Sequence, residues 1–315
     1  MKKFLLSAIT VIMAGTFVSC NKNEDVIEKT NPNDRKVVNF SSNITKVNIP
    51  TTRAGGSTWD ADDAIGIFMF EESSTNIVEN KDNIEYITQN GGTIGTFEPS
   101  DSDTVFFPDN GNKVRFMSYY PYTANITDYV YSIDVSNQEK QSAIDLLYSF
   151  ADTVYFNKTA ADKKVPLVFD HKLTKININV KPGEGLKSND IENIIVTFEG
   201  FNTKAEFDLI TGKIISQYDT YTITPLKINA ITDYDFSCES IVLPTADPNA
   251  ANIKFDLNNG EGQDSDVFTW SFKTNGELKS GFEYTYNVTV NRSGIVIEAT
   301  INKWAEGGSL DIEAE

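Results

Sequence analysis

The sequence predicts a mainly β fold, and stretches of alternating residues carry this prediction. Residues 175–181 alternate strictly between aliphatic and polar side chains, as a strand with one buried face does. Residues 284–290 and 295–301 also alternate, and the turn-forming residues 291–294 separate them. This order predicts a β-hairpin near the end of a chain of 315 residues.

Two further turns predict two more hairpins. Residues 109–111 (Asp-Asn-Gly) come before an apolar run, and residues 211–212 (Thr-Gly) separate two apolar runs. One segment allows two interpretations. Residues 136–139 have the pattern of a helix capping box, but the apolar residues that follow, up to Phe150, fit a short strand equally well.

A break in the strand pattern predicts a domain boundary. Residues 182–190 contain one proline and two glycines and lie near the middle of the chain. We therefore predict an N-terminal β domain over residues 37–182 and a C-terminal β domain over residues 190–315. A chain of this length can bury two cores of ordinary size.

The first 36 residues predict export as a lipoprotein. Residues 1–19 have two lysines and then an apolar run too short to span a bilayer, which is typical of a signal peptide. Ser19 before Cys20 fits processing in which Cys20 receives acyl chains such as palmitate; an ordinary secretory peptide is the alternative. Residues 20–36 would then be a lipidated tether. Each buried CH₂ contributes about 0.8 kcal/mol, so two or three chains anchor stably where one does not.

Residues 37–53 contain a strand whose two halves face opposite ways. Val38, Phe40 and Ile44 share one parity, whereas Val47 and Ile49 have the opposite parity. A straight strand cannot bury both sets on one face, so we expect a bulge or kink between them.

Arg53 follows this strand and raises the question of a cleavage site. It is the sole basic residue between Lys46 and Lys81, and Ala54 and two glycines come directly after it. A protease needs an exposed, extensible backbone, which small residues supply. A plain flexible linker is the alternative interpretation.

The charge of the chain argues against nucleic-acid partners. Its formal net charge is −18, and so acidic a chain repels phosphates and anionic membrane surfaces. Cys238 is the only other cysteine, so no disulfide remains once Cys20 is lipidated.

The sequence contains no convincing catalytic or cofactor-binding set. His171 is the only histidine, which excludes sites built on several histidines and favours a structural role. Asp60, Asp62 and Asp63 are spaced like calcium ligands, and residues 256–266 are also acidic, but neither segment completes a hand-type loop. Solvated acidic loops are favoured, with calcium left open. We expect no enzyme, no metal and no cofactor.

Several aromatic residues allow a second function, glycan binding. Residues 119–122 (Tyr-Tyr-Pro-Tyr) and Trp59, Trp270 and Trp304 offer ring faces on which sugars stack. Core packing is the more frequent use of such residues in β proteins. Paired carboxylates for sugar hydrolysis are not selected by any local pattern, so a hydrolase is the weakest alternative.

Short motifs follow one another in a characteristic order along the chain. They are Cys20, Thr52-Arg53-Ala54, Trp59-Asp60 with residues 63–69, and residues 114–122, 145–147, 169–176, 281–286 and 295–304. In this order they resemble the fimbrillin family, the type V pilins of outer-membrane anaerobes. The resemblance covers nearly the whole chain.

The resemblance implies a fold and a mode of assembly. It implies two tandem β-sandwich-like (transthyretin-like) domains in a protein exported as a lipoprotein. It further implies that an arginine-specific protease cuts after Arg53, so that the strand within residues 37–53 is lost and a groove accepts a donor strand from the next subunit. The expected partners are other pilin subunits (self, tip or anchor), lipoprotein-processing enzymes and that protease.

Location and position in a pilus are expectations of the same kind. Residues 21–25 resemble the acidic signal that sends some lipoproteins to the outer face of the outer membrane, although a solvated tether explains them too. After Trp304 only a short tail remains, with Leu310 and Ile312 as its apolar alternation. Both a stalk subunit and a tip or accessory subunit stay open. The alternative function is a permanently anchored surface lipoprotein that binds glycans.

Overall fold

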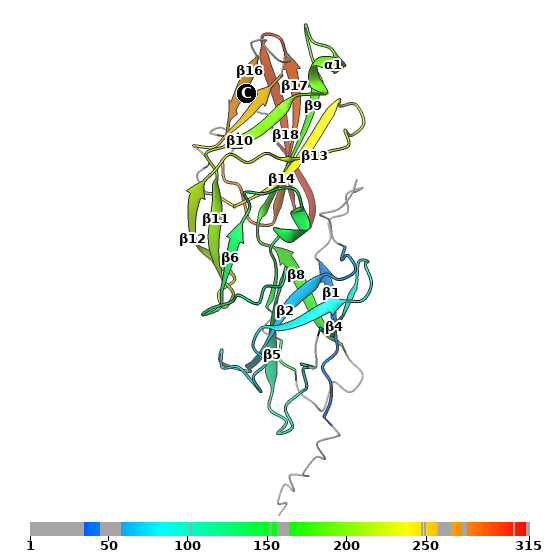
Figure 1. Cartoon of the computed structure of the whole chain (residues 1–315), viewed down its shortest axis with the longest axis vertical. Coiled ribbons are helices and arrows are strands. Elements are labelled where there is room, and N and C mark those ends of the chain that lie inside the picture. The colour runs from blue at the N-terminus through cyan, green and yellow to red at the C-terminus, as the bar shows by residue number, and fades with distance from the viewer. Residues whose placement is uncertain are drawn as a thin grey trace, which may run out of the picture. The chain divides into compact units, whose positions relative to one another are not determined.

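The chain is mainly β, as Figure 1 shows for the computed structural model of the protein. The structure describes residues 35–44, 58–100, 103–150, 153–155, 164–246, 248, 250–257, 266–272, 276–304 and 306–312. The described residues, from Arg35 onward, belong to one compact unit. Within these ranges no helix has the length and apolar character that crossing a bilayer requires. The predicted mainly β fold is confirmed.

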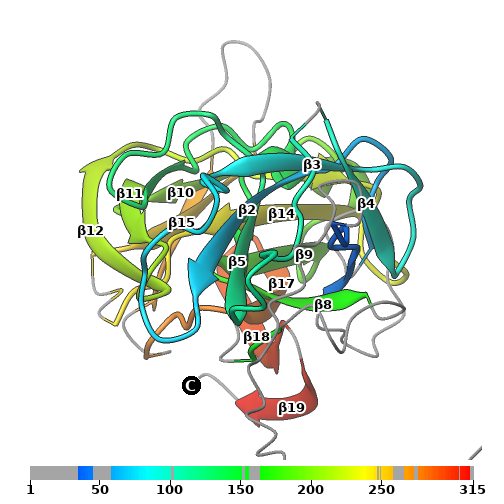
Figure 2. The same cartoon turned by 90° about the horizontal axis from the view of Figure 1, so that it is seen from below.

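Seven strands close into a barrel. In order around the barrel they are β1 (Phe40–Ile44), β4 (Gly95–Pro99), β3 (Ile84–Thr88), β2 (Ala64–Glu71), β5 (Val114–Tyr120), β7 (Leu147–Phe150) and β8 (Val165–His171). Neighbouring strands are antiparallel, except that β1 and β8 run parallel where the barrel closes. Figure 2 shows the barrel strands from below.

Large apolar side chains from the inner faces of the strands fill the barrel, and the pattern is clearest in strands that alternate between buried and exposed residues. In β8, Val165, Leu167 and Phe169 are buried and the residues between them are exposed. Trp59 packs edge-to-face against Phe97 and Phe169, with ring centroids 5.2 Å apart in each pair. These contacts make the barrel interior a packed core.

Two further sheets enclose a second core. The larger contains β13 (Leu226–Ile228), β14 (Phe236–Val242), β9 (Thr174–Pro182), β17 (Phe282–Asn291), β18 (Gly294–Lys303) and β19 (Glu306–Ile312). The smaller contains β10 (Ile195–Glu199), β15 (Asn252–Asp256) and β16 (Val267–Ser271). Ile176, Ile178 and Val180 all lie in this second core, which confirms the alternation of residues 175–181.

The remaining sheet takes strands from both halves of the chain. It consists of β12 (Lys213–Thr220), β11 (Asn202–Asp208) and β6 (Val130–Asp134), which lie side by side in Figure 1. Tyr148 of β7 packs edge-to-face on Phe207 of β11 at 5.4 Å, and its hydroxyl donates to the Leu209 carbonyl at 2.5 Å. The sheet therefore covers part of the outer face of the barrel.

Two of the three predicted hairpins are confirmed. Asn291 pairs with Gly294 at the turn between β17 and β18, and residues 211–212 lie in the turn that joins β11 to β12. The hairpin predicted at residues 109–111 is wrong. The turn exists, but Phe106 before it pairs with Val37, and β5 after it pairs with β2 and β7. The residues on the two sides of the turn pair with distant segments and not with each other.

The segment with two interpretations contains both kinds of structure. A single turn of 3-10 helix, Gln141–Ala143, precedes β7, so the apolar end of the segment is a strand. The short helix α1 (Ser188–Ile191) corresponds to no pattern that we found in the sequence.

The barrel differs from the sandwich-like fold that the resemblance implies for the first half of the chain. Only two residues separate the end of β8 from the start of β9, which belongs to the six-stranded sheet. The chain therefore passes from the barrel to that sheet before residues 182–190. The division into domains at 37–182 and 190–315 stays a prediction.

Candidate functional site: strand β1 and the groove that it fills

β1 closes the barrel, and it is short. Its five residues pair along their whole length with residues 165–169 of β8. On its other side, residues 40–42 pair with residues 95–97 of β4. Figure 1 shows β1 and its two neighbours by their labels. Removing β1 would leave the edges of β4 and β8 without partners, and such edges pair readily with other strands.

Phe40 is the main apolar anchor of β1. Its side chain is 1% exposed and packs edge-to-face against Tyr86 at 5.2 Å and Phe116 at 5.1 Å. Val38 and Ile44 are buried on the same side of the strand. The parity predicted for these three residues is therefore confirmed. Burying a side chain of this kind contributes roughly 1.5–3 kcal/mol.

Tyr86 lies on β3, two strands from β1 in the barrel, and packs against Phe40. Its hydroxyl accepts a hydrogen bond from the Val105 backbone N–H at 2.9 Å. Burial raises the pKa of Tyr86 to about 12. The phenol therefore stays neutral across the physiological range, and no charge enters the barrel core at this point.

Arg35 holds the start of the described chain, close before β1. It forms ion pairs with Glu79 and Asp109, and its guanidinium lies 4.9 Å from the centre of the Phe106 ring. The backbone adds two hydrogen bonds here, from Phe107 N to Lys36 O and from Val38 N to Val105 O, both 2.9 Å. These contacts fix the chain as it enters the barrel. Local sequence gives no sign of this role for Arg35, because its partners lie far away along the chain.

The other predicted site residues lie outside the described residues. They are Cys20, Val47, Ile49, Arg53 and Ala54. The predicted bulge falls in the same undescribed stretch. Lipidation, cleavage after Arg53 and the second half of the removable strand therefore stay predictions.

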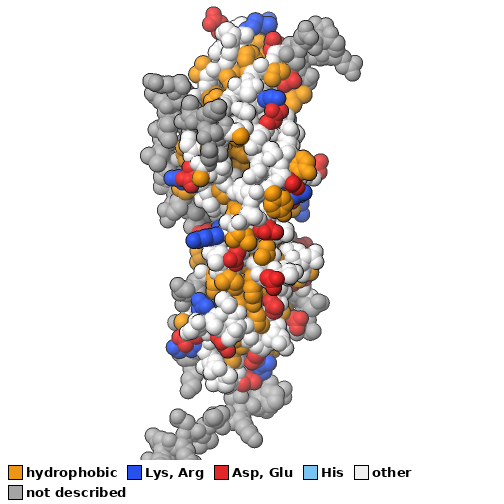
Figure 3. Space-filling view, turned by 90° about the vertical axis from the view of Figure 1, so that its left-hand side faces the viewer, with side chains coloured by type: hydrophobic (Ala, Val, Ile, Leu, Met, Phe, Trp, Pro, Cys, Tyr) orange, Lys and Arg blue, Asp and Glu red, His pale blue; other side chains and the backbone are white. Residues whose placement is uncertain are grey.

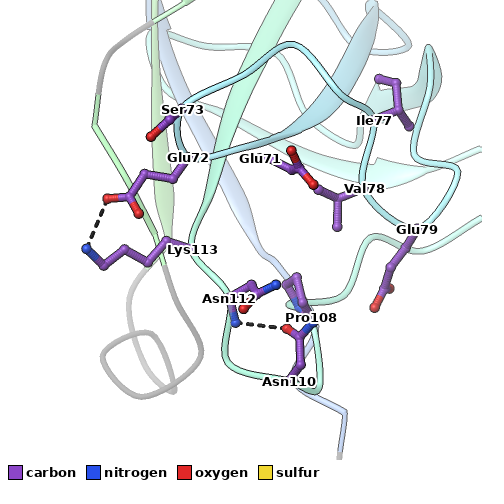
Figure 4. A pocket seen from close by; sticks show the side chains of 10 residues that line it. All are labelled: Glu71, Glu72, Ser73, Ile77, Val78, Glu79, Pro108, Asn110, Asn112 and Lys113. Carbon is purple, nitrogen blue, oxygen red and sulfur yellow. Dashed lines mark hydrogen bonds and ion pairs between the residues drawn. The ribbon is translucent and has the colours of Figure 1, made fainter.

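A polar cavity of about 470 Å³ lies near the partners of Arg35. Figure 4 shows the residues that line it: Glu71, Glu72, Ser73, Ile77, Val78, Glu79, Pro108, Asn110, Asn112 and Lys113. Lys113 pairs with Glu72 at 3.0 Å, and the Asn112 backbone N–H donates to Asn110 Oδ1 at 2.9 Å. In the part of the chain that the structure describes, no three His, Cys, Asp or Glu residues are grouped to hold a metal.

The Asp residues spaced like calcium ligands shape a turn. Asp63 accepts hydrogen bonds from the Asp60 backbone N–H at 2.7 Å and from the Tyr120 hydroxyl at 2.9 Å. Burial raises the pKa of Asp63, and these two hydrogen bonds partly oppose that shift. Both carboxylate oxygens therefore have protein partners. Much of the acidic segment 256–266 lies outside the described residues.

His171 lies at the end of β8 and is buried against the second half of the chain. Its Nδ1 lies 3.0 Å from Asp145, and its ring stacks on Trp304 with centroids 3.9 Å apart and planes 8° from parallel. Trp304 is 4% exposed. The arrangement joins the barrel to the end of β18, and local sequence could not reveal it, since the three residues are far apart in the chain.

Most of the aromatic residues considered for sugar stacking are core residues. Trp59, Tyr119, Tyr120 and Trp304 are buried. Trp270 is half-buried and packs on Phe272 and Tyr286. On the face shown in Figure 3, acidic, basic and hydrophobic side chains are interspersed. The glycan-binding alternative thus loses most of the rings on which it was based.

Comparison with known proteins now adds to this geometry. A family model described as fimbrillin-like matches residues 52–304. The chain belongs to the fimbrillin-like family. The match begins after β1, so the fimbrillin-like region and the closing strand are separate stretches of the sequence.

Several proteins similar to this fimbrillin-like chain come from Bacteroides species. It is 30% identical over 313 residues to "Putative fimbrium subunit Fim1C" of Bacteroides uniformis, covering 97% of this chain and 96% of that protein. A crystal structure of a "putative cell adhesion protein" from Bacteroides uniformis superposes with a TM-score of 0.69 at 28% identity, over 87% of this chain and 100% of the other. A crystal structure of a "putative cell adhesion protein" from Bacteroides ovatus superposes with a TM-score of 0.63 at 21% identity, over 89% of this chain and 99% of the other. At that identity the likeness shows the fold alone.

Proposed function

We propose that this fimbrillin-like protein is a structural subunit of a cell-surface pilus, assembled by donor-strand exchange. The observation that carries the proposal is β1, a five-residue strand that alone bridges β4 and β8 and closes the barrel. The fimbrium subunit and cell adhesion protein among its relatives support a structural role in adhesion over an enzymatic one.

The exchange has a clear physical basis. While β1 is present, it covers the apolar interior around Phe40 and pairs both strand edges. A strand from a neighbouring subunit can restore the same backbone hydrogen bonds and fill the same space. Such a contact joins unlike surfaces of successive subunits, so it produces a filament and not a closed ring.

Proteolysis after Arg53 is the proposed trigger. The chain around β1 is held by backbone pairing and by the Arg35 ion pairs, so a cut on its C-terminal side is needed before the strand can leave. The same cut would release the body of the protein from the lipid at Cys20.

Arg53→Ala should abolish processing. We expect an arginine-specific protease to convert the wild-type protein to a chain that begins at Ala54 and enters high-molecular-weight material, whereas the variant keeps its N-terminus. Intact mass, N-terminal sequencing and size-exclusion chromatography measure this. Arg292→Lys, at an exposed arginine in the β17–β18 turn, is the matched control and should be cut like the wild type. Wild-type protein that stays monomeric and begins at lipidated Cys20 would contradict the proposal.

Cys20→Ala should prevent lipidation. We expect metabolic labelling with a fatty-acid analogue to mark the wild-type protein and leave the variant unlabelled, because the lipid that carries the acyl chains is attached through Cys20. Cys238→Ala should be labelled normally, since Cys238 is buried and burial raises the pKa of its thiol. A wild-type protein that takes up no label would rule out the lipoprotein assignment and leave an ordinary secretory peptide.

The position in the pilus is left as two alternatives. A stalk subunit must donate a strand as well as accept one, and its C-terminal strands are the candidates. β19 pairs with β18 along the edge of the six-stranded sheet, so a donor role would require that pairing to open. A tip or accessory subunit needs only the groove. We place the protein on the surface of the outer membrane before processing and in the pilus afterwards.

A further inference from the structure

Ser42 is a polar residue on the buried side of β1. It lies between Phe40 and Ile44 on that side, and its side chain is fully buried. Among the described residues, its hydroxyl has no hydrogen-bond partner. A buried polar group without a partner is destabilising, because it has lost its hydrogen bonds to water. The central residue of β1 therefore places an unpaired hydroxyl in an apolar core.

The space around Ser42 admits only a small side chain. Ser42 is paired with Gly95 on β4 and with Leu167 on β8. A Cβ atom at Gly95 would lie 2.8 Å from Ser42 Oγ and 2.7 Å from the ring of Phe97. The missing side chain of Gly95 thus provides the room that Ser42 uses, and Phe97 and Leu167, both buried, limit that room.

We propose that the groove selects for a small side chain at the position of Ser42, and that the serine makes β1 bind in the groove more weakly than a strand with alanine there. The groove prefers a strand from a second fimbrillin-like subunit that carries alanine here, between a large apolar residue and an aliphatic one. The inference rests on the proposed strand exchange, and it supplies a reason for exchange to proceed in one direction. The incoming strand gains the packing of β1 without the unpaired hydroxyl.

The first test uses the full chain and does not depend on exchange. Ser42→Ala should raise the melting temperature by about 2–5 °C, because it removes the unpaired hydroxyl and keeps the size. Ser42→Leu should lower it, because the space beside Gly95 is filled. Ser41→Ala, on the opposite side of β1, is the matched control and should change it little. A fall in melting temperature for Ser42→Ala, or no change for Ser42→Leu, would overturn the proposal.

The second test measures exchange directly. A protease recognition sequence inserted at Gly55 allows the chain to be cut without relying on Arg53. Labelled peptides spanning residues 37–49, with Ser, Ala or Leu at position 42, are then added. We expect the alanine peptide to bind about tenfold more tightly than the serine peptide, which corresponds to about 1.4 kcal/mol, and the leucine peptide to bind poorly.

The two tests separate the inference from the proposed function. If no peptide binds while Ser42→Ala still stabilises the full chain, the removable strand is wrong and the size selection stands. If all three peptides bind equally, the strand is removable and the selection at position 42 is wrong.

Discussion

Phe40→Ala is expected to lower the free energy of unfolding by roughly 3–5 kcal/mol, the range measured when buried phenylalanines are truncated. The reason is local. Phe40 is 1% exposed and makes edge-to-face contacts with Tyr86 and Phe116 in the middle of the barrel core. Truncation leaves a cavity that the surrounding strands cannot fill, because neighbouring positions on β4 and β8 are held by backbone pairing.

The loss should be concentrated at β1. Hydrogen exchange is expected to accelerate first in β1 and at the facing edges of β4 and β8, before the six-stranded sheet is affected. Thermal or chemical unfolding gives the size of the effect. Asn43→Ala is the matched control: Asn43 is exposed on the same strand, and its loss should change stability by less than about 0.5 kcal/mol. Equal losses for the two variants would show that the strand is not anchored through its buried face.

The second large effect is expected at Trp304. Trp304→Ala should also cost roughly 3–5 kcal/mol, because the indole is 4% exposed and stacked on the His171 ring at 3.9 Å. Its loss would leave the buried pair of His171 and Asp145 without its cover. We expect Trp304→Phe to recover part of the stability, since a flat ring can still stack.

The control for Trp304 lies on β18, the strand that Trp304 directly follows. Val296 of β18 is 56% exposed, and Val296→Ala should change stability by less than about 1 kcal/mol. Denaturant unfolding followed by circular dichroism measures all three variants. A Trp304→Ala protein as stable as Val296→Ala would mean that the contact between the barrel and the end of β18 contributes little.

Local sequence patterns predicted the strands well and their partners poorly. Alternation placed Ile176, Ile178 and Val180 on one buried face because that pattern depends only on neighbours in the chain. Closing the barrel depends on a parallel contact between β1 and β8, and no pattern within either strand specifies its partner. The same limit explains the wrong hairpin at residues 109–111.

The candidate site was predicted in part for the same reason. The parity of Val38, Phe40 and Ile44 identified the buried face of β1. Ser42 has the same parity, but a serine in a strand gives no sign of whether its hydroxyl will find a partner. The role of Gly95 depends on its register with Ser42, and that of Arg35 on two distant carboxylates.

The parallel contact between β1 and β8 also bears on the order in which the protein folds. β1 is synthesised first among the barrel strands, yet the strand that completes its pairing begins at Val165. Closing so long a loop carries an entropic cost, and non-local contacts of this kind form late. We therefore expect β1 to pair with β8 late in folding, after the barrel strands nearer to each other in sequence have paired. The open barrel that the proposed strand exchange requires would resemble this late stage of folding, so we expect chains that fold close together to be exposed to premature pairing.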